Sequence, residues 1–112
     1  MILPQDPGEE VIGVSSVIEK LDVLRRVGAE ELVDQALTKL IQMEIERTSS
    51  EQERLKRILS DFERKYGISS EEAHRKFESG ELGDNADLFE WTGIYEIYRT
   101  NENYLKMLKG KL

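Results

Sequence analysis

The longest stretch of this sequence without glycine or proline runs from residue 29 to residue 66. Its apolar residues recur at spacings of three and four, which places them along one face of an α-helix. They are Leu32, Val33, Ala36, Leu37, Leu40, Ile41, Ile45, Leu55, Ile58, Leu59, Phe62 and Tyr66. The sequence therefore predicts a long amphipathic helix over residues 29–66, and this feature constrains the fold more than any other.

A polar stretch through Thr48, Ser49 and Ser50 leaves the continuity of this helix open. Ser50 and Glu53 have the spacing of a capping box, so a second helix could begin there. We favour one continuous helix, because the stretch contains neither glycine nor proline. A break at Thr48–Ser50 is the alternative.

The length of a continuous helix bears on the oligomeric state. A helix over residues 29–66 would be about 57 Å long. A compact chain of 112 residues has a diameter of only about 35 Å. Such a helix would extend beyond its own domain, and its apolar residues there would need cover from a second chain. We therefore expect dimerisation to complete the fold.

A first, shorter helix is expected before the long one. Ser16 and Glu19 have capping-box spacing, which predicts a helix beginning at Ser16. Gly28 is suited to its end, because glycine adopts the left-handed conformation of a helix stop at little cost. The residues before this helix contain both prolines and two glycines, so residues 1–13 are predicted to be a flexible tail.

Two more helices are expected after Gly67, which ends the long helix. Ser69, followed by an acidic residue three positions on, opens a short helix that runs to about Ser79. Asp84 or Asn85 caps a last helix, which runs to about residue 109. The predicted fold is all-α, with a single helical domain over residues 14–112. In it a long helix, a short helix and a C-terminal aromatic helix form a hairpin or bundle.

All eight aromatic residues lie between positions 62 and 104, so the best-packed core should join the end of the long helix to the last two helices. Apolar residues on the long and the last helices are the predicted homodimer or partner interface. The residues selected are Val33, Leu37, Leu40, Leu55, Leu59, Phe62, Trp91, Tyr95 and Tyr98.

The charge of the chain disfavours several classes of partner. The net charge is −7, and residues 67–87 hold six acidic against two basic residues. No segment has the basic excess that binding to nucleic-acid phosphates or to anionic membranes requires. There is no cysteine, no signal-peptide pattern and no apolar run long enough to span a membrane. We expect a cytoplasmic protein.

Few residues have the pattern of a catalytic or metal site. Glu71 and His74, the only histidine, have the spacing of carboxylate and imidazole ligands in helical-bundle metal sites. Asp84, Asp87 and Glu90 recur every three residues, but helix capping accounts for acidic residues at a helix start. No nucleophile–base motif and no phosphate-binding glycine pattern is present. We predict no enzyme activity, no cofactor and no metal, and keep a small metal-binding protein as an alternative.

A second alternative is a DNA-binding repressor. Residues 14–40 could form a ribbon-helix-helix or helix-turn-helix unit with its turn at Gly28, in which Arg25 and Arg26 would contact phosphates. The absence of a basic excess around these two arginines argues against this interpretation.

Three motifs occur in an order that resembles a known group of proteins. They are Phe-Glu-Arg-Lys-Tyr-Gly-Ile-Ser-Ser-Glu-Glu at 62–72, Phe-Glu-Ser-Gly-Glu-Leu-Gly-Asp at 77–84 and Asp-Leu-Phe-Glu-Trp at 87–91. Residues 55–105 resemble small prokaryotic helical proteins that look like antitoxins of toxin–antitoxin modules. The resemblance implies a homodimer, or a complex in which an acidic, amphipathic helix covers a basic toxin. Thr92-Gly93-Ile94, Asn101 and Asn103 depart from the pattern.

Overall fold

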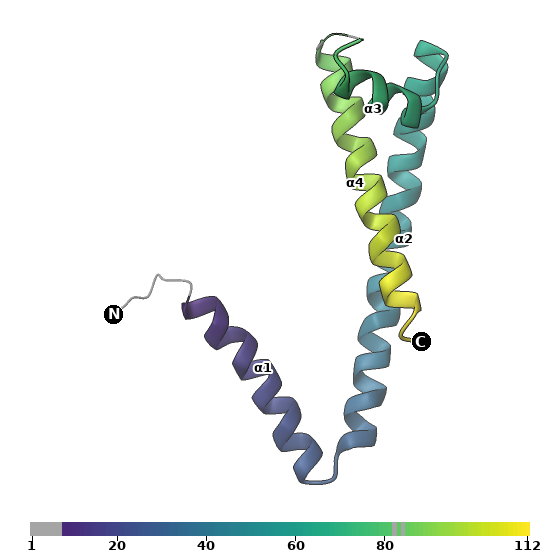
Figure 1. Ribbon diagram of the computed structural model, residues 1–112. Coiled ribbons are helices and arrows are strands. Elements are labelled where there is room, and N and C mark those ends of the chain that lie inside the picture. The colour runs from purple at the N-terminus through teal and green to yellow at the C-terminus, as the bar shows by residue number, and fades with distance from the viewer. Residues whose placement is uncertain (1–7, 82, 84) are drawn as a thin grey trace. The chain divides into compact units, whose positions relative to one another are not determined.

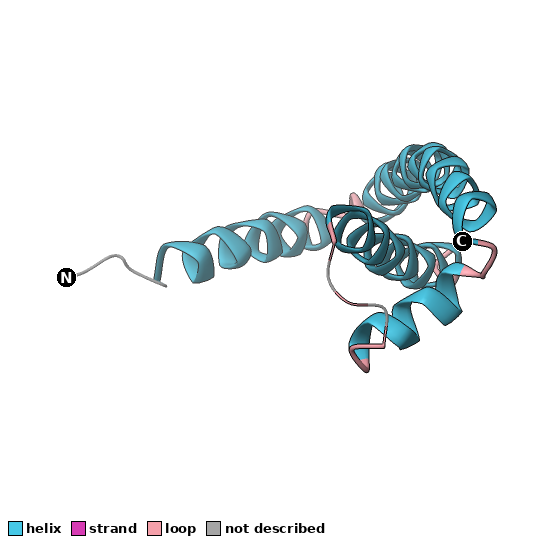
Figure 2. Cartoon of the chain, turned by 90° about the horizontal axis from the view of Figure 1, so that it is seen from above, coloured by secondary structure: helices cyan, strands magenta, loops and turns pink. Residues whose placement is uncertain are grey.

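The computed structural model describes residues 8–81, 83 and 85–112, with the side chains of the first helix described from Ser16 onward (Figure 1). Over this part of the chain every regular element is a helix, as the cartoon in Figure 2 shows. The helices are α1 (Gly8–Arg26), α2 (Glu30–Tyr66), α3 (Ser70–Glu78) and α4 (Ala86–Lys109). The predicted all-α class is confirmed.

The chain divides into two compact units, and the boundary falls inside α2. Residues 1–40 form the N-terminal unit and residues 41–112 the C-terminal unit. The sequence predicted one helical domain over residues 14–112, so this division differs from the prediction.

The start of α1 differs from the prediction. The capping-box spacing of Ser16 and Glu19 predicted a helix beginning at Ser16, but α1 begins at Gly8. Residues 8–13 are therefore helical rather than part of a tail, and residues 1–7 of the predicted tail lie outside the described residues.

The turn between α1 and α2 is built on Gly28, as predicted. Gly28 has φ +87°, a left-handed conformation that residues with a Cβ rarely adopt. Its N–H donates to the carbonyl of Arg25 at 3.1 Å, and Ala29 N–H donates to the carbonyl of Leu24 at 2.9 Å. These bonds satisfy carbonyls that the end of α1 would otherwise leave without partners.

Helix α2 is continuous over its 37 residues, which confirms the favoured prediction at Thr48–Ser50. The polar stretch does not interrupt the helix, and Thr48 at its start is buried, whereas Ser50 is exposed. Thr48 and Gln52 are both buried, on the same face of α2 as the buried Leu55 and Leu59. Gln52 Nε2 donates to the backbone carbonyl of Tyr98 at 3.0 Å. The C-terminal part of α2 thus packs against α4, and Figure 1 shows the two running side by side.

Helices α3 and α4 begin at the predicted caps. Ser69 Oγ accepts a hydrogen bond from Glu72 N–H at 3.1 Å, and Asn85 Oδ1 accepts one from Leu88 N–H at 2.9 Å. Each cap satisfies one of the backbone donors that a helix start leaves free. The first turns of α3 and α4 are therefore both fixed by capping side chains that the sequence identifies.

The core of the C-terminal unit joins α2, α3 and α4 around Trp91, whose surface is only 1% exposed. The Trp91 ring stacks on Phe62 at a centroid distance of 5.5 Å and on Tyr66 at 5.4 Å. Its Nε1–H donates to Ser70 Oγ at 2.8 Å, so the polar edge of the indole is also satisfied. Leu59, Ala73 and Leu88 complete the buried cluster with Trp91. This confirms the predicted position of the core.

Candidate functional site

Eight of the exposed large apolar side chains that the structure describes lie in the N-terminal unit. We call this group the N-terminal apolar surface, and its residues are between 39% and 72% exposed. Five come from α1 and the turn after it, and three from the start of α2. They are Val17, Ile18, Val23, Leu24, Val27, Leu32, Leu37 and Leu40.

Part of this surface is an open groove of about 300 Å³ between α1 and the start of α2. Its apolar lining comes from Ile18, Leu21, Val33 and Leu37. The spacing of these residues along each helix places them on one face, so both helices contribute an apolar stripe to the groove. The groove is large enough to accept apolar side chains from another helix.

Charged groups of both signs lie beside the groove. Asp22 Oδ1 and Oδ2 pair with Arg25 at 3.0 Å and with Arg26 at 2.8 Å respectively. Glu30 lines the groove from α2. The two arginines that the repressor alternative would use for phosphate contacts are thus each paired with a carboxylate of their own helix.

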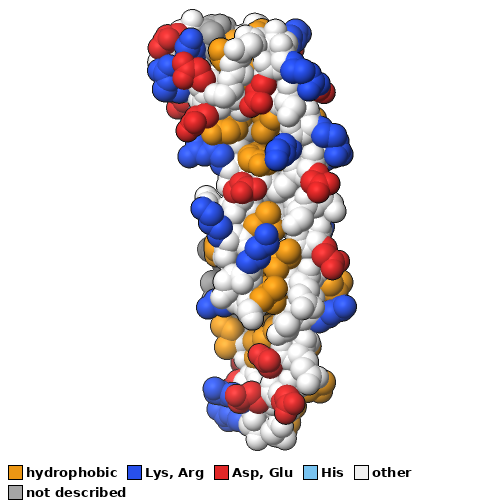
Figure 3. All heavy atoms as spheres, turned by 90° about the vertical axis from the view of Figure 1, so that its right-hand side faces the viewer, with side chains coloured by type: hydrophobic (Ala, Val, Ile, Leu, Met, Phe, Trp, Pro, Cys, Tyr) orange, Lys and Arg blue, Asp and Glu red, His pale blue; other side chains and the backbone are white. Residues whose placement is uncertain are grey.

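The structure separates the nine residues predicted as a partner interface. Val33, Leu37 and Leu40 are in the N-terminal unit, where Leu37 and Leu40 are exposed and Val33 is half-buried. The other six are in the C-terminal unit. Figure 3, which views one face of the molecule, shows apolar side chains in orange reaching the surface between charged ones.

For three of the six the interface assignment is corrected. Leu55, Leu59 and Trp91 are buried in the core of their own chain, so they offer no surface to a partner. Their apolar spacing is the same whether a face packs on its own chain or on another, which is why the sequence could not separate the two. The aromatic residues Phe62, Tyr95 and Tyr98 are half-buried against that core.

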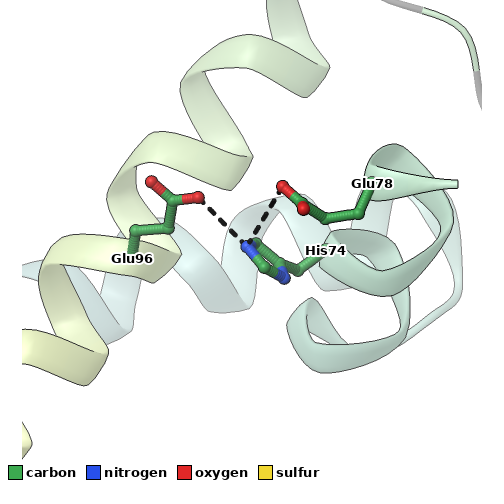
Figure 4. Close-up of side chains that lie close together, drawn as sticks. All are labelled: His74, Glu78 and Glu96. Carbon is green, nitrogen blue, oxygen red and sulfur yellow. Dashed lines mark hydrogen bonds and ion pairs between the residues drawn. The ribbon is translucent and has the colours of Figure 1, made fainter. Parts of the chain in front are cut away.

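A second candidate site is a cluster of one imidazole and two carboxylates in the C-terminal unit (Figure 4). His74 Nε2 lies 3.1 Å from Glu96 Oε2 and 4.0 Å from Glu78 Oε2. His74 and Glu78 come from α3, and Glu96 comes from α4. The ligand atoms of all three lie within 4.8 Å of one another, the geometry of a group that could hold a metal ion. The His74 side chain is 17% exposed, whereas the two carboxylates reach the surface.

The cluster differs from the pair that the sequence identified. Glu71 borders the same hollow as His74, but the carboxylates grouped with the imidazole are those of Glu78 and Glu96. Glu78 lies four residues after His74 on α3, a spacing that sequence inspection could have found. Glu96 could not be found in this way, since it reaches His74 only because α4 packs beside α3.

Of the acidic residues predicted near the start of α4, Asp87 has described partners. Asp87 Oδ2 accepts hydrogen bonds from Lys65 Nζ at 2.7 Å and from Tyr66 Oη at 2.6 Å. These bonds hold the pKa of Asp87 below its ordinary value, and the bond to Asp87 raises the pKa of Tyr66. Asp84, the first residue of the predicted series, lies outside the described residues. Asp87 therefore ties α4 to the end of α2.

Comparison of the chain with protein-family models, with curated proteins and with solved structures finds no match. The resemblance of residues 55–105 to antitoxin-like proteins stays a prediction from their motifs. Within the described residues, no helix combines the length and the apolar character needed to cross a bilayer.

Proposed function

We propose that this chain is a non-enzymatic protein–protein interaction module that forms homo-oligomers through the N-terminal apolar surface. One observation carries the proposal. Among residues 16–47, all of which the structure describes, no residue is buried. Nine large apolar residues of this segment are exposed instead, eight of them on the N-terminal apolar surface and the ninth Met43.

The free energy of helix formation makes such exposure costly. Short helices are marginally stable in water, and most of their stability in proteins comes from burying an apolar face. Complete burial of a valine, leucine or isoleucine side chain contributes about 1.5–3 kcal/mol. The part of α1 whose side chains are described, from Ser16 onward, has no buried residue and so forgoes much of this contribution in an isolated chain. A partner that covers the surface would supply it.

The occupant that we propose is a second copy of the same chain. A two-fold interface uses the same patch on both subunits, so the patch must complement itself. The groove in the N-terminal apolar surface supports this condition, because its apolar lining is accompanied by acidic Asp22 and Glu30 and by basic Arg25. Each charged group can find the opposite sign on the other copy.

The test is the oligomeric state of the full chain and of charge-insertion variants, measured by sedimentation velocity over a range of concentrations. We expect a dimer for the unchanged chain. Leu37→Glu or Leu40→Glu should weaken dimerisation about 10- to 100-fold, because each change places a carboxylate in an apolar contact. The matched control is Ile97→Glu, which puts the same charge at a residue of α4 that is similarly exposed.

Two results would contradict this proposal. One is a monomer at every concentration. The other is a dimer that Ile97→Glu weakens as much as Leu37→Glu, since the contact would then lie outside the N-terminal apolar surface.

We further propose that this module acts as an antitoxin-like partner of a basic protein. The motifs of residues 62–91 support the antitoxin interpretation, and the net charge of −7 would attract a basic toxin. Co-expression with the product of the neighbouring gene should give a copurifying complex and should restore growth. If the neighbouring product neither copurifies nor impairs growth, the antitoxin role is wrong, whatever the oligomeric state.

A further inference from the structure

We propose that His74, Glu78 and Glu96 form a binding site for a divalent transition-metal ion, for which Zn²⁺ is the best match. The site lies in the C-terminal unit and is independent of the proposed dimerisation surface. Its basis is the convergence of one ring nitrogen and two carboxylate oxygens from two helices (Figure 4).

The helices that carry the three side chains are held firmly. Ala73, next to His74, is buried in the core of the C-terminal unit. At the start of α3, Ser70 Oγ accepts the hydrogen bond from the Trp91 indole of α4 at 2.8 Å, and Ser70 N–H donates to Glu63 of α2. Both helices are therefore anchored within about one turn of the candidate ligands, a condition for a metal site of defined geometry.

The positions on α3 suit a shared ligand. His74 and Glu78 are four residues apart, so their side chains lie on the same face, one turn from each other. The Glu96 carboxylate approaches from α4 and completes a triangle of donors. Two ligands one turn apart on a helix, with a third from a neighbouring helix, enclose a position that all three can reach.

The electrostatics of the cluster favour a cation. Both carboxylates face the same ring nitrogen, Nε2, at 3.1 Å and 4.0 Å. That nitrogen carries at most one hydrogen, which can be donated fully to only one carboxylate. The carboxylate oxygens of Glu78 and Glu96 lie within 4.8 Å of each other, so their negative charges repel. A divalent ion would bind the nitrogen lone pair and both carboxylates together, and would neutralise the repulsion.

The basic side chains around the cluster are occupied elsewhere. Arg75 Nη2 pairs with Glu72 Oε2 at 2.7 Å, and the Arg99 guanidinium lies over the Tyr95 ring at 5.7 Å from its centroid. Within the described residues, the ion pairs of Glu78 and Glu96 are those with His74. Among the described residues, neither carboxylate is thus held by a lysine or an arginine.

The ligand set fits zinc chemistry. Zn²⁺ binds imidazole nitrogen and carboxylate oxygen at about 2.0–2.2 Å, so its ligand atoms lie roughly 3–3.5 Å apart. The separation of His74 Nε2 from Glu96 Oε2, 3.1 Å, is already in that range. Glu78 Oε2, at 4.0 Å from the same nitrogen, would have to move closer, which its exposed side chain permits. Three protein ligands leave the fourth tetrahedral position to water.

The experiment is a calorimetric titration of the metal-free full chain with Zn²⁺ alone. We expect one ion per chain. Glu78→Gln and Glu96→Gln should each weaken binding at least about tenfold, and His74→Ala should abolish it. The control is Glu90→Gln, which removes a carboxylate from the exposed surface of α4 outside the cluster and should leave the affinity unchanged.

A nuclear magnetic resonance titration gives an independent readout, because the chain has a single histidine. The imidazole resonances of His74 should shift on addition of Zn²⁺, and should shift less in Glu96→Gln at an ion concentration that just saturates the unchanged chain. Circular dichroism of each variant checks that its helices are retained.

Two outcomes would overturn the site. In the first, Zn²⁺ binding is unchanged in both Glu78→Gln and Glu96→Gln. In the second, Glu71→Gln abolishes binding while Glu96→Gln does not, which would assign the ion to the Glu71–His74 pair. Repeating the titration with Leu37→Glu separates the two proposals, since loss of the dimer should leave the Zn²⁺ affinity unaltered.

Discussion

Residues 16–47 and residues 48–105 have similar apolar spacing and different burial. The first segment has no buried residue, and the described residues of the second include ten. Both include part of α2, so the contrast exists within a single continuous helix. A periodic apolar face shows that a helix has something to pack against, and leaves open whether that surface belongs to the same chain.

The kinds of side chain explain part of this contrast. Aromatic residues occur only between positions 62 and 104, and one large ring can fill the space between three helices. Trp91 does so against Phe62 and Tyr66. The earlier segment has valine, leucine and isoleucine on two helices, and its apolar groove remains open. A second copy would fill that groove with side chains of the same kind.

The largest expected effect comes from a substitution in the better-packed region, the core of the C-terminal unit. Trp91→Ala should lower the stability of the C-terminal unit by about 3–5 kcal/mol, because it leaves a cavity at the centre of the core. Leu32→Ala, at an exposed residue of the same long helix that carries Phe62, should cost less than about 0.5 kcal/mol in a monomeric background such as Leu37→Glu. Thermal melts followed by circular dichroism measure both. Equal losses would mean that the burial contrast has no energetic counterpart.

A smaller effect should distinguish packing from hydrogen bonding near the start of the buried segment. Gln52 Nε2 donates to the Tyr98 carbonyl and to Glu102 Oε2, while Gln52 Oε1 is buried without a partner among the described residues. Gln52→Ala should cost about 1–3 kcal/mol, because it removes these bonds and leaves a gap. Gln52→Leu should cost less, since it keeps the volume and removes the unsatisfied oxygen. Urea denaturation provides the measurement, and a larger loss for leucine would contradict this account.

The smallest effect concerns the bond between the ends of α2 and α4. The pKa of Asp87 is lowered in the folded chain. The contribution of the ionised Asp87 side chain to stability is therefore fully present above the unfolded pKa of about 3.9. It is lost as the pH falls through the folded value. Asp87→Asn should therefore reduce the melting temperature slightly at neutral pH, and the difference should close below about pH 4. Glu90→Gln is the control for loss of charge, and a difference that persists at low pH would exclude the linkage.

Much of the fold follows from local signals in the sequence. Ser69, Asn85 and Gly28 determine helix boundaries through side-chain caps or a left-handed turn, and all three act as predicted. Local signals also caused the error at α1, since the spacing of Ser16 and Glu19 indicates a start where the helix simply continues. A capping box can occur inside a helix whenever the preceding residues are helical as well.

The parts that could not be predicted depend on packing between helices. Thr48 and Gln52 lie in the polar stretch at which a break of the long helix was the alternative prediction. Their burial is explained by the proximity of α4. The assignment of Leu55 and Leu59 to a partner failed for the same reason, since periodicity does not identify the neighbour. The role proposed for Glu96 likewise requires that α4 lies beside α3.

The position of Trp91 has a practical consequence for spectroscopy. It is the only tryptophan of the chain, and its indole is enclosed by Phe62, Tyr66 and Ser70. Intrinsic fluorescence excited at the indole band therefore reports on the C-terminal unit alone, whereas far-ultraviolet ellipticity averages over every helix. If the N-terminal unit unfolds separately, the fluorescence and the ellipticity will follow different melting curves in one sample, without an added label.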